Sequence, residues 1–292
     1  MGATVVSAAD SGYFHLLQGL VLSLKAQRSS AELPVTVLDV GLAEAECAWL
    51  EAQGVARIAV ARIAERLPPL PERADGKPKL SLAQRLRPHI PDLVPGHALY
   101  LWMDADLWLQ REGVIPIYLK AAEQGRMAIV PEIHLAYPSL FSQRQYAGMF
   151  KTYEQLFDRA TAQALAQNPT INSGCFALAA SAPHWRLWAE TLEGLLRRDS
   201  FYYAEQFALN HVLYSRGKEA PSRFLPAGFN WICHQALPVL DAKTGLLLEP
   251  APPYPPLGIV HLTVGAKAGE RELRAADGGR VKRSLKYRAG NY

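Results

Sequence analysis

Apolar residues along the first sixty positions follow two kinds of spacing. Short continuous apolar runs at 4–9, 34–40 and 55–60 are typical of buried strands. Between them, apolar residues recur every three or four positions over 14–27, and 43–53 is rich in Ala and Glu, so we expect both segments to be helices. This alternation of strands and helices predicts a parallel sheet that is covered by helices.

The rest of the chain continues the mixed pattern. A continuous apolar run at 98–103 predicts a central strand that is buried on both faces, and the Pro-rich residues 67–78 predict a loop. The other expected elements are helices at 80–87, 115–124, 143–167, 183–198 and 204–215, strands at 127–131, 171–178 and 258–262, and an irregular Pro-rich stretch at 224–256. No internal repeat or linker stands out, so we expect one mixed α/β domain.

Composition bounds the class of protein. The chain has 292 residues, of which 49% are hydrophobic and 20% charged, and these are ordinary values for a globular protein. Its net charge of +4 is too small to predict a nucleic-acid partner. Three widely spaced cysteines, Cys47, Cys175 and Cys233, exclude a disulfide framework and a clustered zinc site. We expect them to be buried apolar side chains in a reducing compartment.

Positive charge is concentrated from Lys267 onward. We expect residues 269–292 to form a basic C-terminal tail, which either lies free in solvent or makes peripheral contact with the inner face of an anionic membrane. No apolar run reaches the ~18 residues of a membrane span. Residues 1–10 lack the basic start of a signal peptide, so we expect a cytoplasmic protein.

Two carboxylates follow the predicted central strand. Asp104 and Asp106 come directly after the apolar run 98–103. Ligands of open α/β sheets bind beyond the carboxyl ends of strands, and two carboxylates at such a point can bind one Mg²⁺ or Mn²⁺. The alternative is a solvated pair at a strand end, because an Asp-x-Asp triplet arises by chance in many chains of this length.

Two other strand ends carry side chains of related chemistry. His261 ends an apolar run, and its imidazole can complete a metal site, while Lys267 would suit a phosphate. The alternative for His261 is a histidine of the core. Asp10 and Tyr13 follow the first strand and suit a nucleoside, or else form a simple turn and helix cap.

Seven short segments occur in an order that one enzyme family shares. They are A-A-D-S-G-Y at 8–13, S-L-A-Q-R-L at 81–86, L-Y-L-W-M-D-A-D at 99–106, N-S-G at 172–174, E-Q-F-A-L-N at 205–210, L-P with N-W at 225–231, and H-L-T-V-G-A-K at 261–267. Together they resemble the GT-A glycosyltransferases, most closely glycosyltransferase family 8, the retaining galactosyl- and glucosyltransferase and glycogenin group. The chain differs from that family at Phe207, where the family has Asp, and at Gly265, which comes one position late.

The resemblance implies a GT-A (Rossmann-like) mixed sheet with helices on both faces. It implies a domain over 1–268, with a nucleotide-sugar half at 1–110 and an acceptor half at 111–268. Acceptor loops are expected at 62–79, 132–150 and 218–256. The implied reaction moves a hexose from a nucleotide diphosphate sugar, expected to be a UDP-sugar, to a saccharide, lipid-linked or peptide acceptor with retention.

The resemblance also assigns site residues. Asp104, Asp106 and His261 would hold Mn²⁺ or Mg²⁺. The donor would contact Ala8, Asp10, Tyr13, Arg85, Asp104, Ala105, Asn172, Ser173, Gly265 and Lys267. Gln206 would steady the oxocarbenium-like centre, and Glu205 would bind sugar hydroxyls or act as a nucleophile. The alternative for Glu205 and Gln206 is an exposed helix start, where the helix dipole favours an acidic residue.

Two other functions stay open at this point. Sugar-phosphate nucleotidyltransferases usually carry a Gly-rich basic loop after the first strand, and residues 8–15 lack one. A non-catalytic nucleotide-sugar-binding protein would keep the fold and bind the donor without turning it over.

Overall fold

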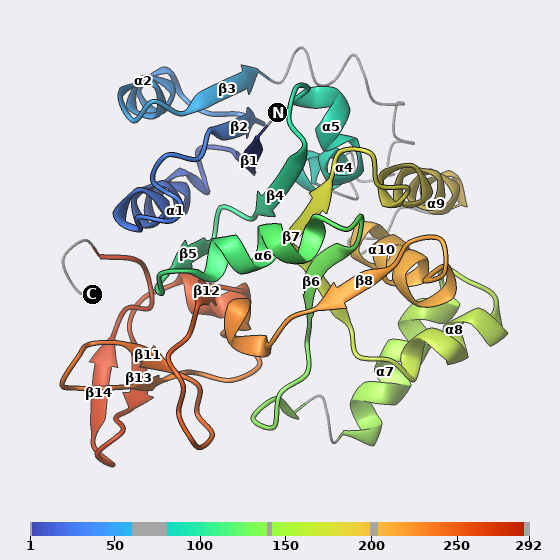
Figure 1. The fold of residues 1–292 in the computed structure, drawn as a ribbon. Helices are drawn as coiled ribbons and strands as arrows, with labels where there is room; N and C mark the ends of the chain where they lie inside the picture. Colours follow the sequence, from blue (N-terminus) through green and yellow to red (C-terminus); the bar gives the residue numbers. More distant parts are fainter. Residues whose placement is uncertain (1, 60–80, 139–141, 199–203, 289–292) are drawn as a thin grey trace.

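A seven-stranded mixed sheet forms the centre of the computed structural model, which describes residues 2–59, 81–138, 142–198 and 204–288 (Figure 1). The strand order is β3-β2-β1-β4-β7-β6-β8. The strands are β1 (Ala3–Ala9), β2 (Val35–Asp39), β3 (Ala56–Ala59), β4 (Leu99–Met103), β6 (Met127–Pro131), β7 (Ile171–Ala179) and β8 (Ser222–Phe224). Strands β1 to β4 are parallel, and β7 runs antiparallel to both β4 and β6. This confirms the expected mixed α/β sheet; the expected loop at 62–79 lies outside the described residues.

Helices cover both faces of the sheet, because neighbouring residues of a strand point to opposite sides. Val5 and Val6 of β1 therefore belong to different buried clusters. The helices on the side of Val5 are α1 (Phe14–Ala26), α2 (Glu44–Ala52) and α6 (Val114–Ala122). Those on the side of Val6 are α4 (Leu82–Leu86), α5 (Ile90–Leu93), α9 (His184–Arg198) and α10 (Ala204–Ser215).

The single helix expected at 143–167 is two helices. Helix α7 spans Gln143–Glu154 and α8 spans Arg159–Ala166. Asp158 lies between them with an extended backbone, and its carboxylate accepts a hydrogen bond from the backbone N–H of Thr161 at 3.0 Å. Such a cap starts a new helix, whereas the apolar spacing continues across the break. The apolar periodicity alone therefore could not predict the break between α7 and α8.

A smaller sheet is attached to the end of β4. It has β12 (Ile259–His261) in the middle, between β5 (Leu107–Leu109) and β9 (Trp231–Ile232). Only residues 104–106 separate β4 from β5. The stretch expected to be irregular also contains the short strands β10 (Val239–Leu240) and β11 (Leu247–Leu248). Because β4 continues into β5, the small sheet lies against the carboxyl end of the central strand.

Residues 271–288 are not a free tail. Strands β13 (Arg271–Arg274) and β14 (Arg280–Arg283) form an antiparallel hairpin, at the lower left of Figure 1. Leu273 and Leu285 are buried in the same cluster as Trp108, whose indole Nε1 donates a hydrogen bond to the carbonyl of Leu285 at 2.8 Å. Single inward-facing leucines among charged residues produce no long apolar pattern, so the burial of Leu273 and Leu285 could not be predicted from the sequence.

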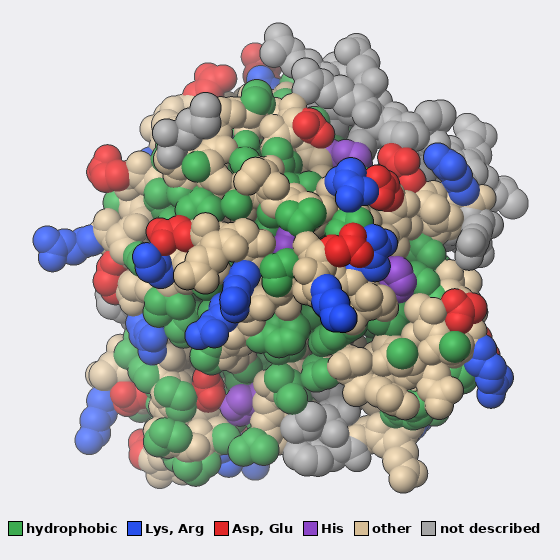
Figure 2. Space-filling view, turned by 45° about the vertical axis from the view of Figure 1, so that its right-hand side comes forward, with side chains coloured by type: hydrophobic (Ala, Val, Ile, Leu, Met, Phe, Trp, Pro, Cys, Tyr) green, Lys and Arg blue, Asp and Glu red, His purple; other side chains and the backbone are tan. Residues whose placement is uncertain are grey.

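Charge is spread over the molecular surface. On the face that Figure 2 shows, basic and acidic side chains are interspersed. Among the described residues, we find no helix with the length and apolar character to cross a membrane. Contact of the basic C-terminal segment with a membrane stays a prediction. All three cysteines are free thiols. Cys175 and Cys233 are buried, as expected from the sequence, whereas Cys47 is half-buried.

Leu273→Ala tests whether the hairpin belongs to the core. We expect the free energy of unfolding to fall by about 2–5 kcal/mol, because Leu273 is fully buried. Its register partner Val281 is 38% exposed, so Val281→Ala should cost only about 0.5 kcal/mol. Urea denaturation measures both values, and equal effects of the two substitutions would contradict the assignment.

Candidate functional site

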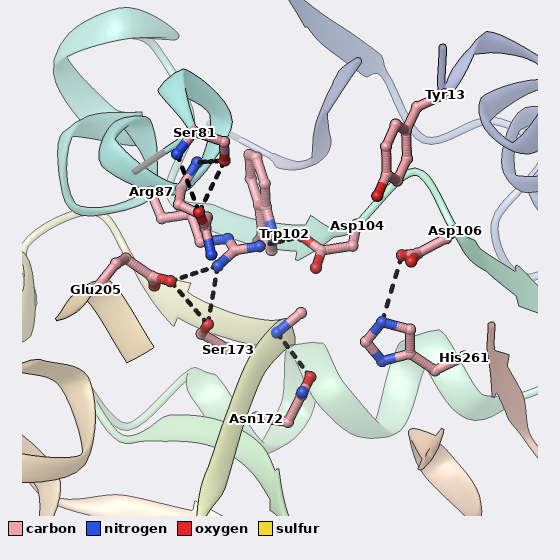
Figure 3. Close-up of polar contacts among 12 residues, drawn as sticks. Tyr13, Ser81, Arg87, Trp102, Asp104, Asp106, Asn172, Ser173, Glu205 and His261 are labelled. Carbon is pink, nitrogen blue, oxygen red and sulfur yellow. Dashed lines mark hydrogen bonds and ion pairs between the residues drawn. The ribbon is translucent and has the colours of Figure 1, made fainter. Parts of the chain in front are cut away.

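Three side chains that can bind a metal meet where β4 ends. Asp104 and Asp106 follow β4, and His261 ends β12. Antiparallel pairing of β12 with β5 places His261 opposite Leu107 and therefore beside Asp106. The ligand atoms of the three side chains lie within 4.8 Å of one another (Figure 3). The fold thus brings His261 together with Asp104 and Asp106, the two other predicted metal ligands, which lie more than 150 positions before it in the sequence.

Gly174 of β7 keeps the space between these ligands open. A Cβ atom at this position would lie 2.6 Å from Cε1 of His261 and 2.8 Å from Oδ2 of Asp104. Any side chain here would press on both ligands. Two carboxylates and one imidazole are a donor set that suits Mn²⁺, and Mg²⁺ with added water or phosphate oxygens. The residues present therefore fit a divalent cation.

Asn230 orients the imidazole of His261. Its Nδ2 donates a hydrogen bond to Oδ1 of Asn172 at 3.3 Å, so its own Oδ1 is the atom that accepts from Nδ1 of His261 at 3.0 Å. Nε2 of His261 is thereby left facing Oδ1 of Asp106 at 3.3 Å. Histidines that bind metals usually have their second ring nitrogen held in this way.

Asp106 is buried between two basic side chains. Nζ of Lys267 lies 2.7 Å from Oδ2 of Asp106, and His261 faces the other oxygen. Burial alone would raise the pKa of the Asp106 carboxyl, but the charges of His261 and Lys267 lower this pKa to about 2. Asp106 is therefore ionised at neutral pH and available to a cation.

Asp104 is held through one oxygen atom. Its Oδ1 accepts hydrogen bonds from the indole Nε1 of Trp102 at 2.7 Å and from Arg87 at 2.5 Å. The Arg87 guanidinium also lies over the Trp102 ring, 5.3 Å from its centre. Oδ2 of Asp104 is consequently the oxygen that faces Gly174 and His261.

Arg87 links Asp104 to Glu205 of α10. Its NH1 group donates to Oε2 of Glu205 at 2.5 Å and to Oγ of Ser173 at 2.9 Å. Both Arg87 and Glu205 are buried. Burial raises the pKa of the Glu205 carboxyl to about 7, despite the opposing charge of Arg87. Glu205 is fully buried, so the alternative of an exposed helix start is wrong for this residue.

A cavity of about 370 Å³ opens beside these residues, which is within the size range of ligand pockets. Of the predicted donor and metal residues, those that line it are Ala8, Asp10, Tyr13, Asp104, Ala105, Asp106 and Lys267. Lys267 donates to the hydroxyl of Tyr13 at 2.8 Å and lies over its ring. Asp10 also forms the predicted turn, because its carboxylate accepts from the backbone N–H of Tyr13 at 3.1 Å.

Arg87, rather than Arg85, is the arginine of this cavity. Arg85 belongs to α4, whereas Arg87 follows the end of that helix and begins a 3-10 turn over Arg87–His89. Two positions along such a helical segment correspond to a rotation of roughly 200°, so the two side chains project to opposite sides. Arg85 is half-buried with Glu193 of α9 as a charged neighbour. Arg85 is not among the described residues that line the cavity, so the donor contact expected of it stays a prediction.

The remaining predicted residues are not among the described residues that line the cavity. Asn172 accepts from the backbone N–H of Gly174 at 2.9 Å, and Ser173 contacts Arg87. Gln206 is half-buried on α10. Gly265 follows Val264, whose φ of 49° is the left-handed conformation that glycine favours. Val264 therefore makes the turn at the position where the family resemblance expects glycine.

No protein-family model and no curated protein matches the chain. Solved structures do match. A crystal structure of the galactosyltransferase LgtC with donor and acceptor sugar analogues aligns with a TM-score of 0.56 and 16% identity, over 90% of this chain and 88% of that one. The chain has the GT-A fold. An active-site mutant of LgtC gives a TM-score of 0.54 at 16% identity, over 99% of this chain and 92% of that one.

The GT-A fold also occurs as part of longer proteins. The apo glycosyltransferase GlyE of Streptococcus pneumoniae TIGR4 aligns with a TM-score of 0.53 and 15% identity, over 91% of this chain and 55% of that one. The bifunctional glycosyltransferase WbbM aligns with a TM-score of 0.54 and 14% identity, over 78% of this chain and 39% of that one. At these identities the likeness defines the fold, and the reaction has to be argued from the site.

Gly174→Ala tests the cation site directly. The added methyl group would press on His261 and Asp104, so we expect the dissociation constant for Mn²⁺ to rise about tenfold or more. Isothermal titration calorimetry measures it. Gly194→Ala on α9 is the control, because a Cβ there meets no atom within 4 Å. Equal Mn²⁺ affinity of the two variants would refute this site.

Glu205→Gln tests the buried acid. Because the folded pKa of Glu205 is about 7 and its unfolded pKa is about 4.5, the folded state binds more protons between these values. Stability should therefore fall as pH rises through this interval, by on the order of 1–3 kcal/mol, and Glu205→Gln should remove that fall. Urea denaturation at pH 5, 6 and 7 measures it. Glu190→Gln, at an exposed position, should retain the wild-type slope, and the same slope in Glu205→Gln would contradict the prediction.

Proposed function

We propose that this protein is a metal-dependent glycosyltransferase, which transfers a hexose from a nucleotide diphosphate sugar to an acceptor with retention. One observation carries the proposal: Asp104, Asp106 and His261 converge beside the 370 Å³ cavity at the carboxyl end of β4. The GT-A fold supports it, because the aligned LgtC structure contains donor and acceptor sugar analogues. Retention rests on the resemblance of the motifs to family 8.

Different residues of the cavity would contact different parts of the donor. Tyr13 and Asp10 line it beyond β1 and suit a nucleoside, for which the motif at 8–13 favours UDP. Lys267 and Arg87 line the same cavity and suit the negative charge of a diphosphate. We therefore expect a UDP-sugar to lie across the ends of β1 and β4.

The metal ligands and the two basic residues act on the leaving group. Asp104, Asp106 and His261 would hold Mn²⁺ or Mg²⁺, which supplies positive charge to the departing phosphate. Lys267 is paired with Asp106 in this structure. In the proposed complex, Lys267 exchanges that carboxylate for a phosphate oxygen and adds to the same stabilisation.

The transfer itself breaks one bond and forms another. The acceptor hydroxyl oxygen bonds to the anomeric carbon, the bond from that carbon to the β-phosphate oxygen breaks, and the hydroxyl proton passes to the departing phosphate. Attack on the face that the nucleotide leaves retains the configuration. Glu205 contacts Arg87 and Ser173, so we assign it a positioning role through Arg87, while Gln206 keeps the role that the resemblance implies.

Asp104→Asn combined with Asp106→Asn tests the proposal. We expect Mn²⁺-dependent release of UDP from UDP-galactose or UDP-glucose to fall about 100-fold or more, because the metal and its charge are lost. The matched control is Asp241→Asn combined with Asp277→Asn, which removes two carboxylates that do not line the cavity. Undiminished UDP release in the first variant would refute the metal-dependent mechanism.

The same assays separate the two other functions. A UDP-sugar that raises the melting temperature with Mn²⁺ but is never turned over would favour a binding protein. Formation of a UDP-sugar from UTP and a sugar 1-phosphate would favour a nucleotidyltransferase.

A further inference from the structure

A second cavity, of about 460 Å³, lies between α7 and the segment that joins α8 to β7. Figure 1 shows α7 and α8 at the lower right, beyond the ends of β6 and β7. Three groups of residues form the walls. They are Ser142, Gln145 and Tyr146 of the start of α7, Asn168 and Thr170 of the joining segment, and Glu132 after β6.

The wall that α7 contributes is one face of a helix. Ser142, Gln145, Tyr146 and Met149 recur at a spacing of three and four, which brings their side chains to the same side. Ser142 caps the helix, since its hydroxyl accepts from the backbone N–H of Gln145 at 3.2 Å. Further along, Tyr153 is buried in the core. The cavity wall is thus anchored to the core rather than carried by a loose loop.

Asn172 lies between this cavity and the cation site. Its Nδ2 donates to Oε1 of Glu132, which lines the second cavity, at 3.3 Å. Its Oδ1 accepts from the backbone N–H of Gly174, which faces Asp104 and His261. The side chain of Asn172 therefore contacts both the wall of the second cavity and the backbone beside the cation site. A ligand in the second cavity would lie on the far side of Asn172 from the metal ligands.

The lining of the second cavity suits a neutral ligand with many hydroxyl groups. Amide and hydroxyl side chains both donate and accept hydrogen bonds, as sugar hydroxyls do, and Tyr146 is 42% exposed and offers an aromatic surface. No Lys or Arg is among the described residues that line it. A phosphate would need such a charge, and the first cavity provides it through Arg87 and Lys267.

Glu132 fits a neutral ligand as well. Burial raises the pKa of its carboxyl, while Gln235 and Asn172 oppose this by donating hydrogen bonds to its oxygens. The two amides hold the carboxyl in place at the boundary with the cation site. The second cavity thus combines amide and hydroxyl groups with the apolar side chains of Met149, Ala166 and Pro169. Hydrogen bonds from Gln235 and Asn172 already hold the carboxyl of Glu132.

We propose that the second cavity is the acceptor subsite and binds a neutral saccharide. The inference rests on the proposed glycosyl transfer, and it deepens that proposal by naming the acceptor class and the side chains that recognise it. An acceptor held by Gln145 and Tyr146 would direct one hydroxyl past Glu132 and Asn172, towards a donor sugar beside the cation site.

Saturation-transfer NMR with lactose, maltose and cellobiose tests this inference without requiring turnover. We expect the wild-type protein to bind at least one of these disaccharides in the presence of saturating UDP and Mn²⁺. Gln145→Ala combined with Tyr146→Ala should weaken that binding about tenfold or more, because hydrogen bonds and aromatic contact are lost. Arg144→Ala combined with Lys151→Ala changes exposed positions of α7 that do not line the cavity, and should leave binding unchanged.

Three results would overturn the inference: no binding of any disaccharide, equal binding to the Gln145/Tyr146 variant, or displacement of the sugar by UDP. Metal-dependent hydrolysis of UDP-galactose or UDP-glucose, measured without saccharide, reports on the proposed function separately. The Arg144/Lys151 control variant should retain wild-type hydrolysis. Tyr146-dependent sugar binding without any hydrolysis would support the saccharide site and count against the glycosyltransferase proposal.

Discussion

One buried guanidinium organises the site. Arg87 bonds to Asp104, Ser173 and Glu205 and lies over Trp102, so it joins the helical segment before β4 to β4 itself, β7 and α10. A buried charge is tolerated only when it is paired, and loss of Arg87 would leave two carboxylates without their cation. The requirement to pair these charges therefore fixes how four separate elements meet at the end of the central strand.

Pairing with basic side chains also orients the two carboxylates that we propose as metal ligands. Oδ1 of Asp104 accepts hydrogen bonds from Arg87 and Trp102, and Oδ2 faces Gly174 and His261. Oδ2 of Asp106 forms an ion pair with Lys267, and Oδ1 faces His261. Each carboxylate thus has one oxygen bound to a basic side chain and one oxygen directed inward. Ligands held in this way need little rearrangement when a cation arrives, which favours tight and geometrically defined binding.

Charge also distinguishes the two cavities. Arg87 and Lys267 line the first, whereas the described lining of the second has no Lys or Arg and consists of amides, hydroxyls, one carboxyl and a few apolar side chains. In the proposed reaction, the anionic donor would bind in the first cavity, where these basic side chains and the proposed cation would lie beside its diphosphate. Asn172 contacts both walls, so it is the side chain through which the position of one substrate would affect the other.

The sequence by itself determined the alternation of strands and helices, and it placed Asp104, Asp106 and His261 at strand ends, because periodicity and strand termination are local properties. Tertiary structure decided which arginine lines the cavity, since Arg85 and Arg87 are two positions apart and project to different sides of the helical segment before β4. It also decided the support of His261 by Asn230 and the burial of Leu273 and Leu285 in the C-terminal segment. These contacts join residues far apart in the chain, and no local spacing encodes a contact that forms only when distant strands pair.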